Sequence, residues 1–390
     1  MNKCITIIVL IILINQLSIA EADAHQSSKT PNIVSESALL IDEKTGQVLY
    51  EKYPDNEMYP ASLTKIATAI YAIETGDLDD IVTVSRKARS TGGSSVFLDE
   101  GEQLSLRRLV EGLIINSGND TGVAIAEHLE GSVMNFSDSL NKYLKNTIGV
   151  NNTNFENPHG LFDPAHVTTA TDLAKITQYA MKNKVFRDII GTKQLNWNGE
   201  SWDTTLYTHH KLMREQPYEG ITGGKTGYVT ESGFTLITTA QRNNISLIAV
   251  VLKAPQVDAY NDTTKLLDYG FDNFKTNKIE QGKEYTDEEG IVYEIQDDLY
   301  FTQSVGEQVK PKLSSDGKLT INQKSDDLNV TFKLSKKVED EEKDKQTNKV
   351  DQKIVEESEQ ESGTFLIVFV IVIVAVFFSL RIRKKILLNR

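Results

Sequence analysis

Two uncharged apolar stretches, one at each end of the chain, constrain this sequence more than any other feature. Residues 1–24 combine a basic Lys3, an apolar stretch from Ile5 to Ile14 and small residues after it, a pattern typical of a secretory signal peptide. An uncleaved anchor is the alternative, which is disfavoured because this stretch is short for a membrane span. The residues between the two stretches are therefore expected to fold outside the cytoplasm.

The second stretch predicts a transmembrane helix over residues 364–381. Its uncharged part, Phe365 to Leu380, rises about 24 Å as a helix, slightly less than the ~30 Å hydrocarbon core. Basic side chains from Arg381 onward can snorkel and compensate for the short length. The positive-inside rule then places a short tail, residues 382–390, in the cytoplasm. We expect a cell-membrane protein with a single C-terminal span and its folded part outside.

Charge and cysteine content exclude several classes of function. The net charge of −13 over 390 residues leaves no basic stripe for phosphates, so no nucleic-acid partner is expected. The single cysteine, Cys4, lies in the predicted signal peptide, which excludes an intramolecular disulfide and a thiolate metal cluster. None of the six histidines has a ligand spacing such as His-Glu-x-x-His, so we predict no metal site.

Hydrophobic periodicity predicts an ordered region over residues 25–275. Strand hairpins are expected at 37–52 and 234–252, and helices at 63–73, 104–115, 134–147, 171–186 and 258–274. Thr171 or Asp172 is the expected N-cap of the 171–186 helix. Strands at both ends of the region with helices between them predict a mixed α/β (α+β) domain with an antiparallel sheet and a helical subdomain.

The sequence becomes more polar near residue 276. Residues 276–335 contain short β-like runs separated by turn signals and predict a small all-β, or β-rich, domain. Residues 336–363 are highly charged and contain no aromatic residue, so they cannot bury enough apolar surface to fold alone. We expect a charged linker there, either a flexible coil or a solvated helix.

Three short motifs contain residues suited to chemistry. Ser62-Leu63-Thr64-Lys65 begins a predicted helix, where residues three apart share a face, so Ser62 Oγ and Lys65 Nζ can meet. A lysine with a lowered pKa can take the serine proton and create a nucleophile. Ser117-Gly118-Asn119 lies in a polar break between helices, and Lys225-Thr226-Gly227 follows several glycines. Each motif alone is equally typical of a cap, a turn or a strand start.

The order Ser-x-x-Lys, Ser-x-Asn, Lys-Thr-Gly resembles the active-site signature of penicillin-recognising serine acyl transferases. Residues 33–275 resemble one branch, the low-molecular-mass penicillin-binding proteins that are serine-type D-alanyl-D-alanine carboxypeptidases. The matching segments are Ala61–Lys65, Asn116–Asp120, Asn154–Leu161, Thr169–Ala174 and Gly224–Tyr228. The resemblance implies a β-lactamase/transpeptidase-like fold for the catalytic domain, residues 25–275.

The resemblance also implies a role for each motif residue. Ser62 would be the nucleophile, Lys65 its general base and Ser117 the proton donor to the leaving D-alanine, while Asn119, Lys225, Thr226, Gly227 and Tyr228 would bind substrate. Burial and the like charge of Lys225 would keep Lys65 neutral. Backbone N–H groups of Ser62 and Tyr228 would form an oxyanion hole. Whether His209 contacts the substrate carboxylate is left open.

The expected function is removal of the terminal D-alanine from peptidoglycan stem pentapeptides through an acyl-enzyme. The expected partners are the stem peptide, β-lactams as inhibitors and the membrane through the C-terminal helix; no cofactor is expected. One alternative is a β-lactamase, which the Asn157–Gly160 loop, the β-rich domain and the anchor disfavour. The other is a non-hydrolytic receptor that senses β-lactams or peptidoglycan, which the short 382–390 tail disfavours.

Overall fold

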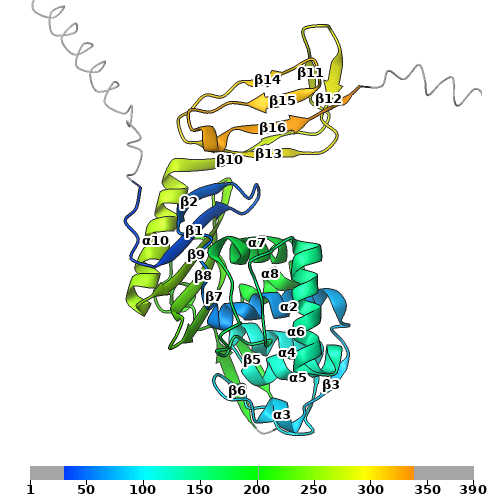
Figure 1. Cartoon of the computed structure of the whole chain (residues 1–390), viewed down its shortest axis with the longest axis vertical. Coiled ribbons are helices and arrows are strands. Elements are labelled where there is room, and N and C mark those ends of the chain that lie inside the picture. Colours follow the sequence, from blue (N-terminus) through cyan, green and yellow to red (C-terminus); the bar gives the residue numbers. More distant parts are fainter. Residues whose placement is uncertain (1–29, 201, 338–390) are drawn as a thin grey trace, which may run out of the picture. The chain divides into compact units, whose positions relative to one another are not determined.

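A five-stranded antiparallel sheet forms the centre of the first of two compact units. The computed structural model of the protein describes residues 30–200 and 202–337, and the first unit contains those up to Gln281 together with 297–312 and 320–332. The strands, in the spatial order β2-β1-β9-β8-β7, are β1 (Ser37–Asp42), β2 (Val48–Lys52), β7 (Ile221–Val229), β8 (Gly233–Arg242) and β9 (Ile245–Ala254). Helices cover both faces of the sheet (Figure 1). The predicted mixed α/β class and antiparallel sheet are confirmed.

Alternating side chains of the central strand β9 enter two different cores. Leu247 and Ala249 belong to the core beneath α10 (Gln256–Asn273), whereas Ile248 and Val250 belong to the core shared with the other helices. Successive side chains of a strand point to opposite faces, so a strand covered on both sides must be apolar throughout. This explains the continuous apolar run from which the hairpin was predicted.

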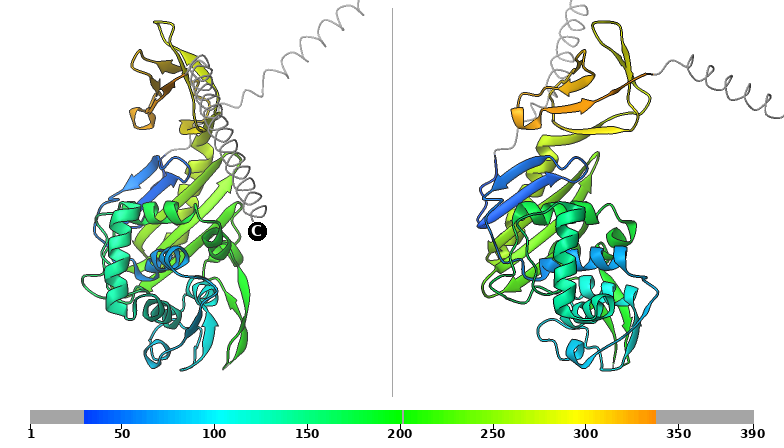
Figure 2. Two further views of the ribbon diagram at one scale, coloured as in Figure 1. Left: turned by 90° about the vertical axis from the view of Figure 1, so that its right-hand side faces the viewer. Right: turned by 45° about the vertical axis from the view of Figure 1, so that its right-hand side comes forward.

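The remaining helices of this unit include α2, whose contacts with its neighbours are the most relevant to the site. They are α2 (Thr64–Thr75), α3 (Arg86–Arg89), α4 (Leu106–Ile115), α5 (Asn119–Glu130), α6 (Val133–Tyr143), α7 (Ala170–Ala180), α8 (Lys184–Ile190) and α9 (Lys211–Arg214). Helices α4 to α8 all contact α2 (Figure 2), and every residue from Thr64 to Ala72 is buried. A helix buried on all sides is normally apolar on all sides. The buried charge-bearing Lys65 is therefore the exception that the active site has to explain.

Two short strand ribbons complete the helical part. The first pairs β3 (Ile81–Thr83) with β4 (Gln103–Ser105), and the second pairs β5 (Gln194–Asn198) with β6 (Asp203–Tyr207). The sequence did not predict either ribbon. Each strand is only three to five residues long, which is too short for a clear alternating pattern.

The predicted helix over residues 171–186 was wrong in its extent. The structure has two helices there, α7 and α8, because the Asn183 side chain accepts hydrogen bonds from two backbone N–H groups of the next turn and caps α8. The N-cap of α7 is Thr169, whose side chain accepts from the N–H of Asp172. The predicted caps, Thr171 and Asp172, instead lie inside the first turn.

The break between helices that contains Ser117-Gly118-Asn119 is short, and Asn119 is already helical. Helix α4 ends at Ile115 and α5 already begins at Asn119, so Asn119 and Asp120 lie in the first helical turn, where a carboxylate is favourable. The buried Asp120 carboxylate accepts hydrogen bonds from the N–H groups of Val96 and Leu98. These hydrogen bonds connect the loop that contains Val96 and Leu98 to the beginning of α5.

The chain after α10 consists mainly of strands. In the first unit β10 (Phe274–Ile279) pairs with β13 (Leu299–Ser304). In the second unit, whose described residues are 282–296, 313–319 and 333–337, β11 (Glu284–Thr286), β12 (Val292–Glu294) and β17 (Ser335–Lys336) form a sheet. The other strands are β14 (Pro311–Leu313), β15 (Lys318–Ile321) and β16 (Val330–Lys333). The predicted β-like runs are confirmed as strands, whereas a separate domain over residues 276–335 stays a prediction.

The predicted membrane-related segments lie outside the described residues. These are the signal peptide (1–24), the transmembrane helix (364–381) and the tail (382–390), together with nearly all of the charged linker (336–363). Among the residues that are described, no helix combines the length and apolar character needed to cross a membrane.

Candidate active site

The three motifs meet where strand β7 packs against the start of α2. Ser62 lies in the 3-10 helix η1 (Ala61–Leu63), Ser117 in the turn between α4 and α5, and Lys225 on β7. Strand β7 contacts η1, and a Cβ added to Gly227 would lie 2.8 Å from the Ser62 backbone nitrogen. Only glycine allows this approach, which explains the glycine of the third motif.

Lys65 is the centre of a buried hydrogen-bond cluster. Its Nζ lies 2.9 Å from Ser62 Oγ and donates to Asn119 Oδ1 and to the carbonyl oxygen of His159, both at 2.7 Å. The Asn119 amide is oriented by its Nδ2, which donates to the Gly92 carbonyl at 2.7 Å. The oxygen of this amide therefore faces Lys65. Sequence spacing predicted the contact between Lys65 and Ser62.

Electrostatics favours the neutral form of Lys65. The side chain is 0% exposed, and burial lowers its pKa well below the ordinary value, with a further decrease from the positive charge of Lys225 and an opposing effect of Asp120. A neutral amine has two N–H groups and one lone pair. Because Asn119 Oδ1 and the His159 carbonyl can only accept hydrogen bonds, they take both N–H groups, and the lone pair is left for the Ser62 hydroxyl.

A second buried cluster contains Lys225 and Ser117. Lys225 Nζ donates to Ser117 Oγ at 3.0 Å and to the carbonyl of Thr226 at 2.9 Å. Burial lowers the pKa of Lys225 to about 7. Ser117 itself has a left-handed backbone conformation with φ of +60°, which is uncommon for a non-glycine residue and is typical of functional sites. The structure thus pairs two residues that are 108 positions apart.

Four of the five predicted substrate-binding residues, Lys225 to Tyr228, follow one another on β7, whereas Asn119 begins α5. Thr226 is buried, and the Tyr228 side chain is 66% exposed. Tyr228 is therefore positioned to contribute through its backbone N–H rather than through its phenol. The His209 imidazole is also exposed, and its contact with a substrate carboxylate stays a prediction.

Two close contacts fix the backbone that carries the nucleophile. Ala61 has φ of +49°, and a Cβ on Gly160 would lie 1.9 Å from the Ala61 carbonyl oxygen. On the opposite side, Thr235 Oγ1 donates to the Pro60 carbonyl at 3.0 Å. The turn before Ser62 is therefore held between the loop containing Gly160 and strand β8.

Sequence reasoning also missed a buried histidine behind β7. His210 Nε2 lies 2.7 Å from Thr238 Oγ1, and a Cβ on Gly224 would lie 2.4 Å from the imidazole ring. Burial, together with the charge of Lys225, lowers the pKa of His210 to about 3, so the ring is neutral. Its position explains why the residue before Lys225 is glycine. His210 and Thr238 are 28 positions apart, and a contact between residues so distant in sequence has no local signal.

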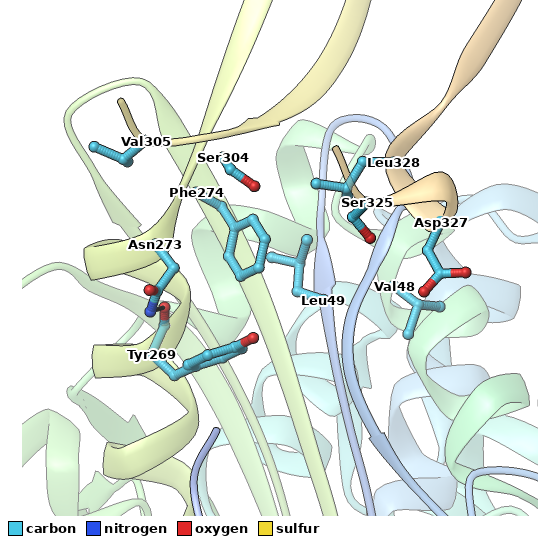
Figure 3. A pocket seen from close by; sticks show the side chains of 10 residues that line it. All are labelled: Val48, Leu49, Tyr269, Asn273, Phe274, Ser304, Val305, Ser325, Asp327 and Leu328. Atoms are coloured by element: carbon cyan, nitrogen blue, oxygen red, sulfur yellow. Dashed lines mark hydrogen bonds between the residues drawn. The ribbon is translucent and has the colours of Figure 1, made fainter. Parts of the chain in front are cut away.

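One surface cavity of this unit is lined by residues other than those of the predicted site. A surface cavity of about 340 Å³ is lined by Val48, Leu49, Tyr269, Asn273, Phe274, Ser304, Val305, Ser325, Asp327 and Leu328 (Figure 3). None of these is a predicted catalytic or substrate-binding residue. Across residues 30–200 and 202–337, no group of three or more His, Cys, Asp or Glu side chains is arranged to hold a metal ion.

Comparisons with known proteins agree with this geometry. A family model described as D-alanyl-D-alanine carboxypeptidase matches residues 24–256. The chain is 35% identical over 300 residues to D-alanyl-D-alanine carboxypeptidase DacA of Haemophilus influenzae, which covers 71% of this chain and 72% of that protein. It is 34% identical over 266 residues to D-alanyl-D-alanine carboxypeptidase DacF of Bacillus subtilis, covering 67% and 68%.

Solved structures show the same similarity. Penicillin binding protein 5 from Haemophilus influenzae superposes with a TM-score of 0.70 at 29% identity, covering 79% of this chain and 98% of that one. Penicillin binding protein 6B from Escherichia coli superposes with a TM-score of 0.67 at 30% identity, covering 80% and 98%. The predicted transpeptidase-like fold is therefore confirmed.

The close contact at Gly160 yields a first prediction. In Gly160→Ala the new Cβ has to displace the Ala61 carbonyl next to Ser62, and a displacement of about 1 Å in a catalytic group can cost about 100-fold in rate. We expect acylation by a fluorescent penicillin to slow by at least about tenfold. Gly149→Ala is the matched control, because Gly149 has a similar φ of +82° but nothing within 4 Å of an added Cβ. Wild-type labelling rates in both variants would contradict the prediction.

Proposed function

Because the chain belongs to the D-alanyl-D-alanine carboxypeptidase family, we propose that Ser62 and Lys65 are the residues with which it removes the terminal D-alanine from peptidoglycan stem pentapeptides. The protein is a serine-type D-alanyl-D-alanine carboxypeptidase that β-lactams inhibit. The observation that best supports the residue assignment is the 2.9 Å contact between Ser62 Oγ and the buried Lys65 Nζ.

Acylation begins with proton transfer from Ser62 to Lys65. The lone pair of the neutral Lys65 amine takes the hydroxyl proton as Ser62 Oγ attacks the carbonyl carbon of the penultimate D-alanine. The new ammonium donates to Asn119 Oδ1 and the His159 carbonyl, which already bind Nζ. The negative charge on the carbonyl oxygen is stabilised by the backbone N–H groups of Ser62 and Tyr228, and such a donor contributes about 3–4 kcal/mol to lowering the barrier.

Departure of D-alanine requires a proton for the leaving nitrogen and a bound terminal carboxylate. The terminal carboxylate of the substrate is bound by Lys225, in its protonated form, and by Thr226. Asn119 also holds the amide backbone of the substrate. As the C–N bond breaks, Ser117 gives its proton to the leaving nitrogen, and the proton that Lys65 took from Ser62 restores the Ser117 hydroxyl, which leaves Lys65 neutral again. Water then attacks the Ser62 ester while Lys65 takes one of its protons and returns it to Ser62 Oγ, so that the shortened peptide leaves as its carboxylic acid.

We also propose that the enzyme is held at the cell membrane by residues 364–381. The uncharged stretch and the basic residues that follow it support this proposal. In this arrangement residues 336–363 form a charged linker after a β-rich module over residues 276–335. The catalytic domain then lies on the cell-wall side, where peptidoglycan is found, after removal of the signal peptide.

Replacing the nucleophile gives the second prediction. Ser62→Ala should abolish both D-alanine release from a pentapeptide and labelling by fluorescent penicillin, because both reactions require the Ser62 ester. In the wild type, mass spectrometry should find a penicilloyl adduct on the Ser62 peptide that persists for minutes or longer. Labelling of Ser62→Ala at another residue would contradict the assignment, and rapid drug turnover by the wild type would indicate a β-lactamase.

Lys225 gives a prediction for the pH dependence of catalysis. Its pKa of about 7 means that the free enzyme loses this positive charge as pH rises through neutrality, and kcat/KM reports the free enzyme. We expect kcat/KM for the pentapeptide to fall as pH rises above about 7. In Lys225→Arg this decrease should be absent, because a guanidinium stays charged. An identical alkaline decrease in both proteins would exclude Lys225 as its cause.

Truncation tests the membrane proposal. A chain that ends at Lys337, just after β17, keeps every described strand and helix and lacks residues 364–381. When expressed with its signal peptide, it should appear in the soluble exported fraction with an unchanged kcat. The full-length chain should remain with membranes until detergent is added. If the truncated protein also stays in the membrane fraction, the N-terminal stretch is the anchor instead.

A further inference from the structure

A buried hydrogen-bond chain runs from His166 to the peptide bond before the nucleophile. The N–H of Glu156 donates to His166 Nδ1 at 3.0 Å, and His166 Nε2 lies 2.8 Å from Thr64 Oγ1. Thr64 Oγ1 in turn donates to the Ala61 carbonyl at 2.9 Å. None of these three bonds is part of the mechanism described above.

The donor and the acceptor of each hydrogen bond follow from the groups at the two ends of the hydrogen-bond chain. A backbone N–H can only donate, so His166 Nδ1 is an acceptor and the ring proton of the neutral imidazole is on Nε2. A carbonyl can only accept, so the Thr64 hydroxyl proton points to Ala61. Thr64 Oγ1 therefore accepts from His166 Nε2. All the donors point along the chain towards the Ala61 carbonyl, an arrangement in which each bond strengthens the next.

The His166 imidazole is held in place by burial and stacking. His166 is 2% exposed and stacks on Phe155, with ring centroids 4.9 Å apart and an interplanar angle of 20°. Burial lowers the pKa of His166 to about 4, and the nearby Asp163 carboxylate opposes this shift only in part. The ring is therefore neutral near pH 7, as the bond directions require.

The hydrogen-bond chain ends at the Ala61 carbonyl, which lies in the same peptide plane as a proposed oxyanion-hole donor, the Ser62 N–H. The Ala61 carbonyl and the Ser62 N–H belong to one planar trans peptide unit, in which they point in opposite directions. A bond that holds the carbonyl oxygen therefore also sets the direction of the N–H. The Thr64 N–H donates to the same oxygen, and the conformation of Ala61, with φ of +49°, is one that L-residues rarely adopt without support.

We propose that His166 and Thr64 are positioning residues that orient the Ser62 N–H of the oxyanion hole through the Ala61 carbonyl. The inference rests on the proposed function, because it assumes that this N–H binds the developing oxyanion. Neither side chain touches the substrate. Their effect is on the transition state, where the carbonyl oxygen carries negative charge, rather than on binding of the uncharged carbonyl in the ground state.

The experiment compares Thr64→Val, His166→Phe and the double variant of the full-length protein in detergent. Valine keeps the shape of Thr64 without its hydroxyl, and phenylalanine keeps the stacking on Phe155 without the ring nitrogens. Three quantities are measured: kcat/KM for a pentapeptide, the Ki of a peptide boronic acid that forms a tetrahedral adduct with Ser62, and the Kd of the tetrapeptide product. Thr64→Ser restores the hydroxyl. Thr263→Val, which removes an equally buried hydroxyl on α10, is the control for stability.

We expect each single variant to lose about tenfold in kcat/KM, part of the 100-fold or more that a deleted oxyanion donor costs. Boronate affinity should fall by the same factor, and product affinity should stay within twofold. Thr64→Ser should recover most of the loss, and the double variant should be no worse than the poorer single one. Thr263→Val should reduce only the melting temperature.

Three results would overturn the inference while the wild type stays active. In the first, both single variants keep kcat/KM and boronate affinity within twofold of the wild type. In the second, the losses in kcat/KM of the two single variants multiply in the double variant. In the third, the affinity for the tetrapeptide product falls by the same factor as the affinity for the boronate. A wild-type protein that releases no D-alanine overturns the proposed function itself, and the inference with it.

Discussion

The cost of burying the Lys65 amine is the constraint on which the active site depends. An ammonium group removed from water loses several kcal/mol of hydration, and Lys65 is completely buried in α2, which five other helices contact. Burial therefore lowers the pKa of Lys65 well below its ordinary value and favours the neutral amine. Because two acceptors bind its N–H groups, the resulting lone pair faces the serine. Burial thus converts an ordinary lysine into a base.

The surrounding backbone keeps this pair in place. Gly160 and Gly227 let two segments approach the turn around Ser62 more closely than any side chain would allow, and the left-handed Ala61 is held by Thr64. Such strained conformations persist only when neighbouring contacts determine them. The same contacts determine the direction of the Ser62 N–H. General base and oxyanion donor are therefore positioned by one compact network at the start of α2.

Features that depend on local sequence patterns were predicted more completely than features that depend on long-range contacts. The apolar periodicity of α2 and β9, and the spacing of Ser62 and Lys65, depend on neighbours in sequence and were predicted correctly. Asparagine is strongly preferred at helix N-caps, so Asn183 marks the start of the separate helix α8, whereas apolar periodicity alone does not distinguish α7 from α8. The bond between Thr64 and His166 joins residues 102 positions apart, and no local pattern contains that information.

The protonation state of Lys65 is the most direct test of the account. In protein labelled with ¹⁵N at lysine Nζ and ¹³C at Cε, the Lys65 resonances can be assigned by their loss in Lys65→Met, which leaves those of Lys225 in place. We predict chemical shifts of a neutral amine for Lys65 in the free enzyme at pH 8, while surface lysines remain charged. An ammonium signal from Lys65 that persists to pH 9 would contradict it.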